Sequence, residues 1–210
     1  MKAPLIAIER YRMGTDGAGL TTLVAFHGCP LSCRYCLNPQ CLSADGVWQA
    51  MTPEAVCEQV ATDHLYFLAT GGGVTFGGGE PCLRSGFIRA FCQLADPQWN
   101  IRLETSLNVP RRHLLALQPF VRQYIVDVKD MNPVIYRSYT GRSNRLVRGN
   151  LRWLAAQGLA HRVVVRLPLI PGYNTEADVQ TSRRQLEAMG FAHFDEFVYI
   201  KDVNAYKKKQ

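Results

Sequence analysis

The sequence predicts an α/β protein built on a parallel β-sheet. Short runs of β-branched and apolar residues alternate with longer helical patterns along the 210 residues. The runs are almost continuously apolar, which is typical of parallel strands covered by helices. Capping residues fall where these helices should begin and end: Thr52 precedes Pro53, Asn174-Thr175 precedes Glu176, and Gly158 and Gly190 follow expected helices.

Six repeats of strand and helix are expected, and they fit either a doubly wound sheet or a barrel of fewer than eight strands. The expected strands are Thr21–Phe26, Gly73–Phe76, Ile101–Thr105, Tyr124–Val128, Val163–Leu169 and Glu196–Ile200. The expected helices are Pro53–Ala69, Leu83–Ala95, Arg111–Leu117, Pro133–Tyr139, Ser143–Gln157 and Glu176–Met189.

Polar or glycine-rich segments follow each of the first five expected strands. They are a cysteine-rich loop and then, in order, GGGEP, TSLN, VKDMN and PGYN. Ligands of parallel α/β proteins bind at the C-terminal ends of the strands, so these segments predict one functional rim.

Composition argues against a membrane-spanning protein, a disulfide-bonded secreted protein and a nucleic-acid-binding protein. The N-terminal segment has no signal-peptide pattern and no apolar run approaches the ~20 residues of a membrane span, so a cytoplasmic protein is expected. Seven cysteines in a reducing compartment favour thiols or metal ligands over disulfides. The net charge of +7 is spread along the chain, which favours solvated surface over nucleic-acid binding.

Cys29, Cys33 and Cys36 form a C-x3-C-x2-C cluster on one loop. Three thiolates can hold three irons of a cubic 4Fe–4S cluster and leave the fourth iron open to a chelating ligand. The alternative is a structural zinc site completed by His27, although His27 is only two residues from Cys29. The remaining cysteines are expected to be small buried hydrophobes, with Cys41 a possible spare ligand and Cys82 placed to face a site; they are Cys41, Cys57, Cys82 and Cys92.

These motifs together resemble the radical S-adenosylmethionine (SAM) superfamily. The cysteine motif contains an aromatic residue, Tyr35, before its last cysteine, and Gly78-Gly79-Glu80 is similar to the superfamily's GGE motif. The segments TDGAG (Thr15–Gly19), VTFGGGEP, LETS, IVDVKDMN and VRLPLIPGYN occur in the same order in glycyl-radical-enzyme activating enzymes of the pyruvate formate-lyase type. The resemblance covers roughly residues 11 to 203.

The resemblance implies an incomplete (β/α)6 TIM-like barrel, with residues 1–210 as a single radical SAM core domain. It also implies an anaerobic oxidoreductase in which Cys29, Cys33 and Cys36 hold one 4Fe–4S cluster and SAM chelates the open iron. One electron would then cleave SAM into methionine and a 5′-deoxyadenosyl radical that takes a hydrogen atom from the substrate.

The cofactor contacts implied by the resemblance lie on the same rim. The backbone at Gly78 and Gly79, within the motif that Glu80 completes, would bind the methionine amine, because glycine allows close approach. Tyr35, Cys36 and Leu37 would lie against the adenine.

Charged residues on the later strands are further candidates. Asp127 and Lys129 match a D-x-K motif and share one face of a strand, so they would contact SAM; a plain ion pair is the alternative. Arg166 needs an anion, either a cofactor carboxylate or a neighbouring Glu such as Glu104. Asn38 and Ser106 would contact the cofactor or cap a loop.

Two protein partners are implied: a glycyl-radical enzyme as substrate and a flavodoxin- or ferredoxin-type electron donor. Exposed basic residues, including Lys207–Lys209, are expected to help docking, and no membrane partner is expected. Lys201 stands where some relatives have a ribose-contacting His. The alternatives are a radical SAM enzyme that acts on a peptide or small metabolite, and a non-catalytic zinc-binding interaction module.

Overall fold

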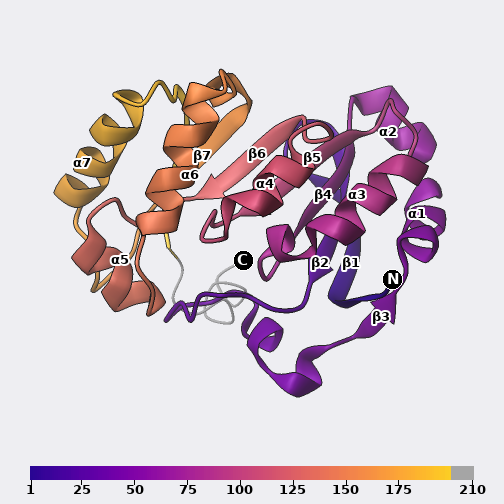
Figure 1. The fold of residues 1–210 in the computed structure, drawn as a ribbon, viewed down its shortest axis with the longest axis horizontal. Helices are drawn as coiled ribbons and strands as arrows, with labels where there is room; N and C mark the ends of the chain where they lie inside the picture. The colour runs from indigo at the N-terminus through magenta and orange to yellow at the C-terminus, as the bar shows by residue number, and fades with distance from the viewer. Residues whose placement is uncertain (200–210) are drawn as a thin grey trace, which may run out of the picture.

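The structure, a computed structural model, describes residues 1–199 and contains one mixed eight-stranded sheet (Figure 1). Its order is β3-β1-β2-β4-β5-β6-β7-β8. Six strands run parallel: β2 (Leu20–Phe26), β4 (Gly73–Gly78), β5 (Asn100–Thr105), β6 (Gln123–Asp127), β7 (Val163–Leu169) and β8 (His193–Val198).

The parallel strands are neighbours in chain order, which decides between the two expected architectures. Right-handed crossovers between successive strands place all connecting helices on one face, so the sheet curls into a barrel wall. A doubly wound sheet would reverse its order at a switch point, and this one does not. Within the described chain the edges β3 and β8 do not pair, so the barrel stays open. The predicted incomplete (β/α)6 barrel is confirmed.

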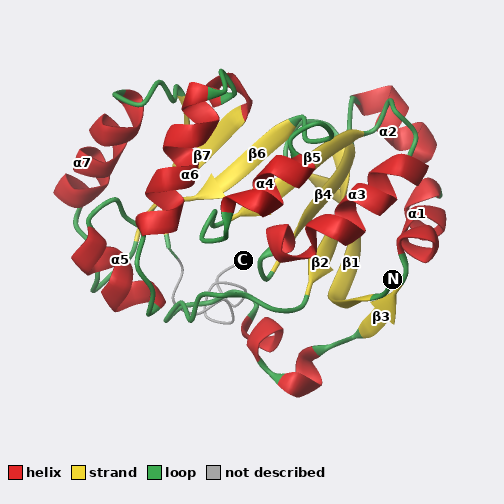
Figure 2. Cartoon of the chain, in the orientation of Figure 1, coloured by secondary structure: helices red, strands yellow, loops and turns green. Residues whose placement is uncertain are grey.

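Seven α-helices occupy the described chain between its strands (Figure 2). They are α1 (Pro53–Ala61), α2 (His64–Thr70), α3 (Ser85–Leu94), α4 (Arg111–Leu117), α5 (Pro133–Thr140), α6 (Arg145–Ala156) and α7 (Glu176–Glu187). The predicted caps form: the Thr52 hydroxyl accepts a hydrogen bond from the Ala55 N–H, and Thr175 forms a capping box with Asp178.

The single helix expected over Pro53–Ala69 is two helices, α1 and α2. The break is at Asp63, whose buried carboxylate accepts hydrogen bonds from Arg10 Nε (3.0 Å) and the Thr22 hydroxyl (2.6 Å). Arg10 and Thr22 come from two different strands, so a tertiary contact ends a helix that local sequence would continue.

Two strands were not expected from the sequence, β1 (Ala3–Met13) and β3 (Gln49–Met51). β1 pairs antiparallel with β2, and its first residues pair antiparallel with β3. The second half of β1 carries Glu9, Arg10 and Arg12, because it lies at an edge where little of its surface is buried. The parallel sheet therefore has a short antiparallel extension on one side.

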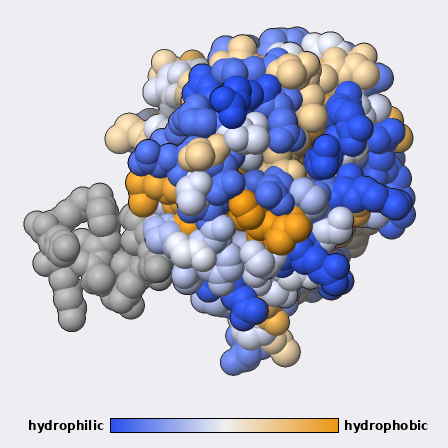
Figure 3. Space-filling model, turned by 90° about the vertical axis from the view of Figure 1, so that its left-hand side faces the viewer, coloured by the Kyte–Doolittle hydropathy of each residue, from blue (hydrophilic) through white to orange (hydrophobic). Residues whose placement is uncertain are grey.

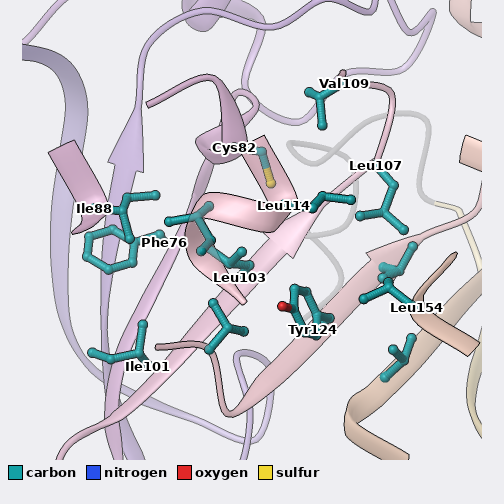
Figure 4. Close-up of a cluster of buried hydrophobic side chains, with 14 of the residues drawn as sticks. Phe76, Cys82, Ile88, Ile101, Leu103, Leu107, Val109, Leu114, Tyr124 and Leu154 are labelled. Carbon is teal, nitrogen blue, oxygen red and sulfur yellow. The ribbon is translucent and has the colours of Figure 1, made fainter. Parts of the chain in front are cut away.

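The main core lies between the sheet and its helices (Figure 4). Alternate strand residues such as Phe76, Leu103 and Tyr124 point to this side and pack among helix residues that include Ile88 and Leu114. The intervening residues point to the inner face of the barrel wall and include Arg102 and Glu104 on β5, Asp127 on β6 and Arg166 on β7.

Within residues 1–199, no helix has the length and apolar character needed to cross a membrane. Lys201 and Lys207–Lys209 lie outside the described residues.

Candidate functional site

A cavity of about 310 Å³ lies at the C-terminal ends of the parallel strands. It brings together eight of the residues singled out from the sequence: Cys29, Cys33, Cys36, Leu37, Gly78, Gly79, Asp127 and Lys129. The secondary candidates Asn38 and Ser106 also line it. The residues that were predicted to share one rim therefore line one cavity.

The cysteine loop is held in place by backbone hydrogen bonds to the end of α5. The Ser32 N–H donates to the Thr140 carbonyl (3.0 Å), and the Arg34 N–H donates to the Tyr139 carbonyl (3.1 Å). Arg142 Nε donates to the Pro30 carbonyl at 3.0 Å. Figure 1 shows the loop running from β2 to α5. The three cysteines thus lie on a loop that hydrogen bonds hold against the end of α5 and the residue two positions after it, Arg142.

The three thiols differ in their electrostatic surroundings. Burial raises the pKa of Cys29 to about 12 and that of Cys33 to about 11. A hydrogen bond from the Cys41 thiol lowers the pKa of Cys36 to about 6. Cys41 is itself buried, so it supports Cys36 from behind. Cys82 is buried in the main core and donates to the Thr105 hydroxyl at 3.5 Å.

The donor set fits an iron–sulfur cluster better than a single zinc ion. Across residues 1–199, no three His, Cys, Asp or Glu side chains converge closely enough to hold one metal ion. A cubic cluster is larger and takes one thiolate at each of its iron corners, so it suits three cysteines spread around a cavity. His27 Nε2 lies 2.7 Å from the Ser43 carbonyl and donates to it.

Glycine is required where the GGE segment meets the cysteine loop. Gly78 has a φ of +89°, and a Cβ on Gly79 would lie 2.3 Å from the Gly28 carbonyl oxygen. Asn38 Nδ2 donates to the Gly78 carbonyl at 3.2 Å, and the Glu80 N–H donates to the Gly28 carbonyl at 2.8 Å. The two backbones are therefore packed in direct contact, and Asn38 joins them.

Glu80 is buried and its carboxylate is fully hydrogen-bonded. Oε1 accepts from the Thr105 hydroxyl (2.6 Å) and the Cys82 N–H (3.2 Å). Oε2 accepts from the Ser106 N–H (3.0 Å) and the Ser106 hydroxyl (2.7 Å). Thr105 and Ser106 line the cavity, so the hydrogen bonds that Glu80 accepts from them hold two lining residues in position.

Asp127 and Lys129 form an ion pair, one of the two alternatives that the sequence left open, and both line the cavity. Lys129 Nζ lies 3.3 Å from Asp127 Oδ2 and 5.5 Å from the centre of the Tyr199 ring. Burial lowers the pKa of Lys129, but Asp127 and Cys33 raise it more, so the net shift is upward. The ammonium group therefore stays charged in the site.

Arg166 points to the same inner face of the barrel as Glu104 and Asp127, is not a lining residue of the cavity, and contacts anions of the protein itself. Its guanidinium pairs with Glu104, Nε lies 3.4 Å from Asp195 Oδ2, and it also donates to the Thr15 carbonyl. Glu104 lines the cavity, and burial raises its pKa. The neighbouring Glu, one of the two alternatives for Arg166, is its partner here.

The Tyr35 ring packs with three other tyrosines. Ring centres lie 6.0 Å from Tyr139, 5.7 Å from Tyr173 and 6.5 Å from Tyr199. Its hydroxyl donates to the Pro171 carbonyl at 3.3 Å. Cys36 and Leu37, the residues predicted to share its adenine contact, line the cavity.

Sequence reasoning missed Glu9, Arg12 and Tyr199 as lining residues. Glu9 and Arg12 lie on β1, which was not predicted, and Arg12 Nη1 lies 2.6 Å from Glu9 Oε2 in an ion pair. The sequence did contain a signal for β1. Its second half carries Glu9, Arg10 and Arg12, and charged residues of this kind are typical of a strand at the edge of a sheet.

Comparison with known proteins agrees with this geometry. The model of the radical SAM superfamily matches residues 23–184. The chain belongs to the radical SAM superfamily. A 4Fe–4S cluster and SAM are the cofactors of this family, and this radical SAM protein is an enzyme.

Its relatives include activating enzymes. The protein is 28% identical to the pyruvate formate-lyase 2-activating enzyme of Escherichia coli strain K12, over 94% of this chain and 80% of the relative. It is 33% identical to the (2S)-3-sulfopropanediol dehydratase activating enzyme of Klebsiella oxytoca, over 80% of this chain and 72% of the relative.

Solved structures share the fold of this radical SAM protein. Streptococcus suis SuiB bound to S-adenosylmethionine matches with a TM-score of 0.63 at 12% identity, over 86% of this chain and 43% of SuiB. A radical SAM methyltransferase from Sphaerobacter thermophilus matches with a TM-score of 0.53 at 18% identity, over 97% of this chain and 80% of that one. The chain spans less than half of SuiB, and the likeness concerns the fold alone.

Proposed function

We propose that this radical SAM enzyme generates a glycyl radical on a partner enzyme, with residues 1–210 acting as one core domain. The observation that supports it most directly is the single cavity in which three thiols, the Gly78-Gly79 backbone and the Asp127–Lys129 pair meet. The similarity to several activating enzymes supports the type of reaction.

Each lining residue has a role in this proposal. Cys29, Cys33 and Cys36 hold the 4Fe–4S cluster, and the backbone at Gly78 and Gly79 binds the methionine amine of SAM. Lys129, buried and positively charged, binds a carboxylate, and Asp127 orients it by the 3.3 Å ion pair.

When bound, the cluster and SAM supply a one-electron reductive cleavage that starts hydrogen-atom abstraction. The protein binds and orients these groups and excludes water from the cavity. Leu31 and Leu37 contribute apolar wall beside the thiols. Abstraction of a hydrogen atom requires no general base, so the proposal assigns none.

The open side of the barrel gives a large substrate its route to the cavity. The cavity lining reaches Arg12 on β1 and Tyr199, the residue after β8. These residues flank the seam at which the described sheet is not closed. A loop of a partner enzyme that carries the target glycine enters there, and a flavodoxin- or ferredoxin-type protein supplies the electron.

The test begins with the protein reconstituted anaerobically with iron and sulfide. With a strong reductant and SAM it should form 5′-deoxyadenosine, and an added partner enzyme should show a glycyl-radical signal in electron paramagnetic resonance. The partner is chosen from enzymes encoded beside this chain, with its target glycine replaced by alanine as the matched control.

Two results would count against the proposal. Protein that takes up zinc but no iron would remove the radical chemistry altogether. The enzyme could also form deoxyadenosine and alter a peptide or small metabolite, with no glycyl-radical signal on the partner enzyme. That result would show a radical SAM enzyme with a peptide or metabolite substrate.

A further inference from the structure

One long segment of the chain is basic without any acidic residue. From Met131 to Thr175 there are seven arginines and no Asp or Glu. The segment includes α5, α6 and the turn between them. Charges of one sign that lie close together create a stronger electrostatic potential at the surface than charges of mixed sign.

This segment lies directly against the cysteine loop. The carbonyls of Tyr139 and Thr140 accept hydrogen bonds from the loop backbone on either side of Cys33, and Arg142 donates to the residue after Cys29. Three of the seven arginines therefore lie where the segment meets the cluster-binding loop: Arg137 in the last turn of α5, and Arg142 and Arg145, which line a depression together with Pro30.

Four exposed arginines form what we name the α5–α6 basic face: Arg34, Arg137, Arg142 and Arg145. In residues 1–199 no ion pair involves any of them, so no carboxylate of the described chain neutralises their charge by direct contact. Two neighbouring depressions share Ser143; Arg137 lines one, and Arg142 and Arg145 line the other. Figure 3 views the molecule from the side on which α5 lies in Figure 1, and most of that face is hydrophilic.

We propose that the α5–α6 basic face is the docking surface for an acidic one-electron carrier protein. The inference rests on the proposed function, because the reaction needs one electron from outside. The reduced carrier loses one electron, the oxidised 4Fe–4S cluster gains it, and no covalent bond forms between the two proteins. Complementary charge increases the rate of such encounters and orients them.

The position of the face favours the electron donor over the protein substrate. The seam that leads to the cavity lies at β1 and β8, whereas α5 and α6 connect β6 to β7. A carrier on the basic face contacts the cysteine loop and leaves the seam free. Electron-transfer complexes are typically small and weak, which suits a patch of a few arginines.

The test measures cluster reduction directly. Reconstituted enzyme is mixed anaerobically with reduced flavodoxin, and the cluster absorbance is followed by stopped flow. In R137E/R145E, which leaves the Arg142 bond to Pro30 intact, the second-order rate constant should fall about tenfold at low ionic strength. Its dependence on salt should flatten. Reduction by photoreduced 5-deazariboflavin, an uncharged small molecule, should not change.

The matched control is R122E. Arg122 is exposed and precedes β6, at the opposite end of the strands from the cysteine loop. It changes the net charge by −2, against −4 in R137E/R145E, so its effect is compared with half of that variant's; it should reduce the flavodoxin rate by less than twofold.

Three outcomes separate the possibilities. An unchanged flavodoxin rate in R137E/R145E overturns the inference while leaving the proposed function intact. Loss of the glycyl-radical signal with photoreduced 5-deazariboflavin, at an unchanged flavodoxin rate, assigns the face to the partner enzyme and also overturns it. A cluster that accepts electrons in every variant but yields no deoxyadenosine contradicts the proposed function instead.

Discussion

The buried carboxylate of Glu80 accepts two hydrogen bonds from one residue, Ser106, through its N–H at 3.0 Å and its hydroxyl at 2.7 Å. The contact joins the loop after β4 to the loop after β5. It makes Glu80 a support for the cavity wall, while the glycines before it meet the cysteine loop.

Replacing Glu80 by alanine should destabilise the protein and weaken SAM binding together. Four donors would lose their acceptor in a buried place, so the free energy of unfolding should fall by about 2–5 kcal/mol. Urea denaturation and SAM titration measure the two effects. Glu58→Ala, on the exposed side of α1, is the control and should change neither. Full stability in Glu80→Ala would contradict the supporting role.

Gly79→Ala should abolish tight SAM binding, because its Cβ would lie 2.3 Å from the Gly28 carbonyl oxygen and push two backbones apart. Equilibrium dialysis with SAM should show a loss of about tenfold or more, which corresponds to ~1.4 kcal/mol. Gly149→Ala is the matched control, since Gly149 lies in α6 with no atom closer than 3.8 Å to its added Cβ. Wild-type affinity in Gly79→Ala would rule out close backbone contact as the reason for glycine here.

Cys33→Ala should prevent assembly of the 4Fe–4S cluster, whereas Cys57→Ala should not. Cys33 lines the cavity, and Cys57 packs against the main core from α1. Iron and sulfide analysis after anaerobic reconstitution, with the visible absorption spectrum, distinguishes them. Equal iron content in both variants would show that the trio does not hold the cluster.

Lys129→Met should weaken SAM binding by about tenfold to a hundredfold, because a buried cation beside Asp127 is replaced by an apolar side chain. Calorimetric titration measures the affinity. The raised pKa of Lys129 means that its charge persists at alkaline pH, so its contribution should remain constant from pH 6 to 9. Lys2→Met, at an exposed position, controls for loss of charge. If Lys129→Met binds SAM with wild-type affinity, Lys129 does not contact SAM and its ion pair with Asp127 has only a structural role.

Thr175→Ala should lower stability at neutral pH by about 1 kcal/mol, because it removes the capping box of α7. Hydrogen bonds from the Thr175 side chain and backbone lower the pKa of Asp178. A carboxyl with a depressed pKa stabilises the fold above its unfolded pKa, about 3.9, and loses this as pH falls through the folded value. The difference between wild type and variant in urea denaturation should therefore shrink at pH 3. A difference that is the same at pH 3 and pH 7 would exclude the Asp178 carboxylate from the cap.

Local sequence determined the elements that repeat along the chain and the residues that carry the chemistry. β7 and α4 have the predicted bounds, because apolar runs and helical periodicity are local signals. The cysteine trio and Gly78-Gly79 share a cavity because parallel strands bring their C-terminal ends to one rim.

The tertiary structure decided those features that depend on contacts between residues far apart in the sequence. β1 is a strand because β2 offers it an edge, and the break at Asp63 exists because Arg10 and Thr22 reach that carboxylate. The carboxylate of Glu80 points to Ser106, and Arg166 has Glu104 as its anion. A buried charge takes the nearest available partner, and only the folded chain determines which group that is.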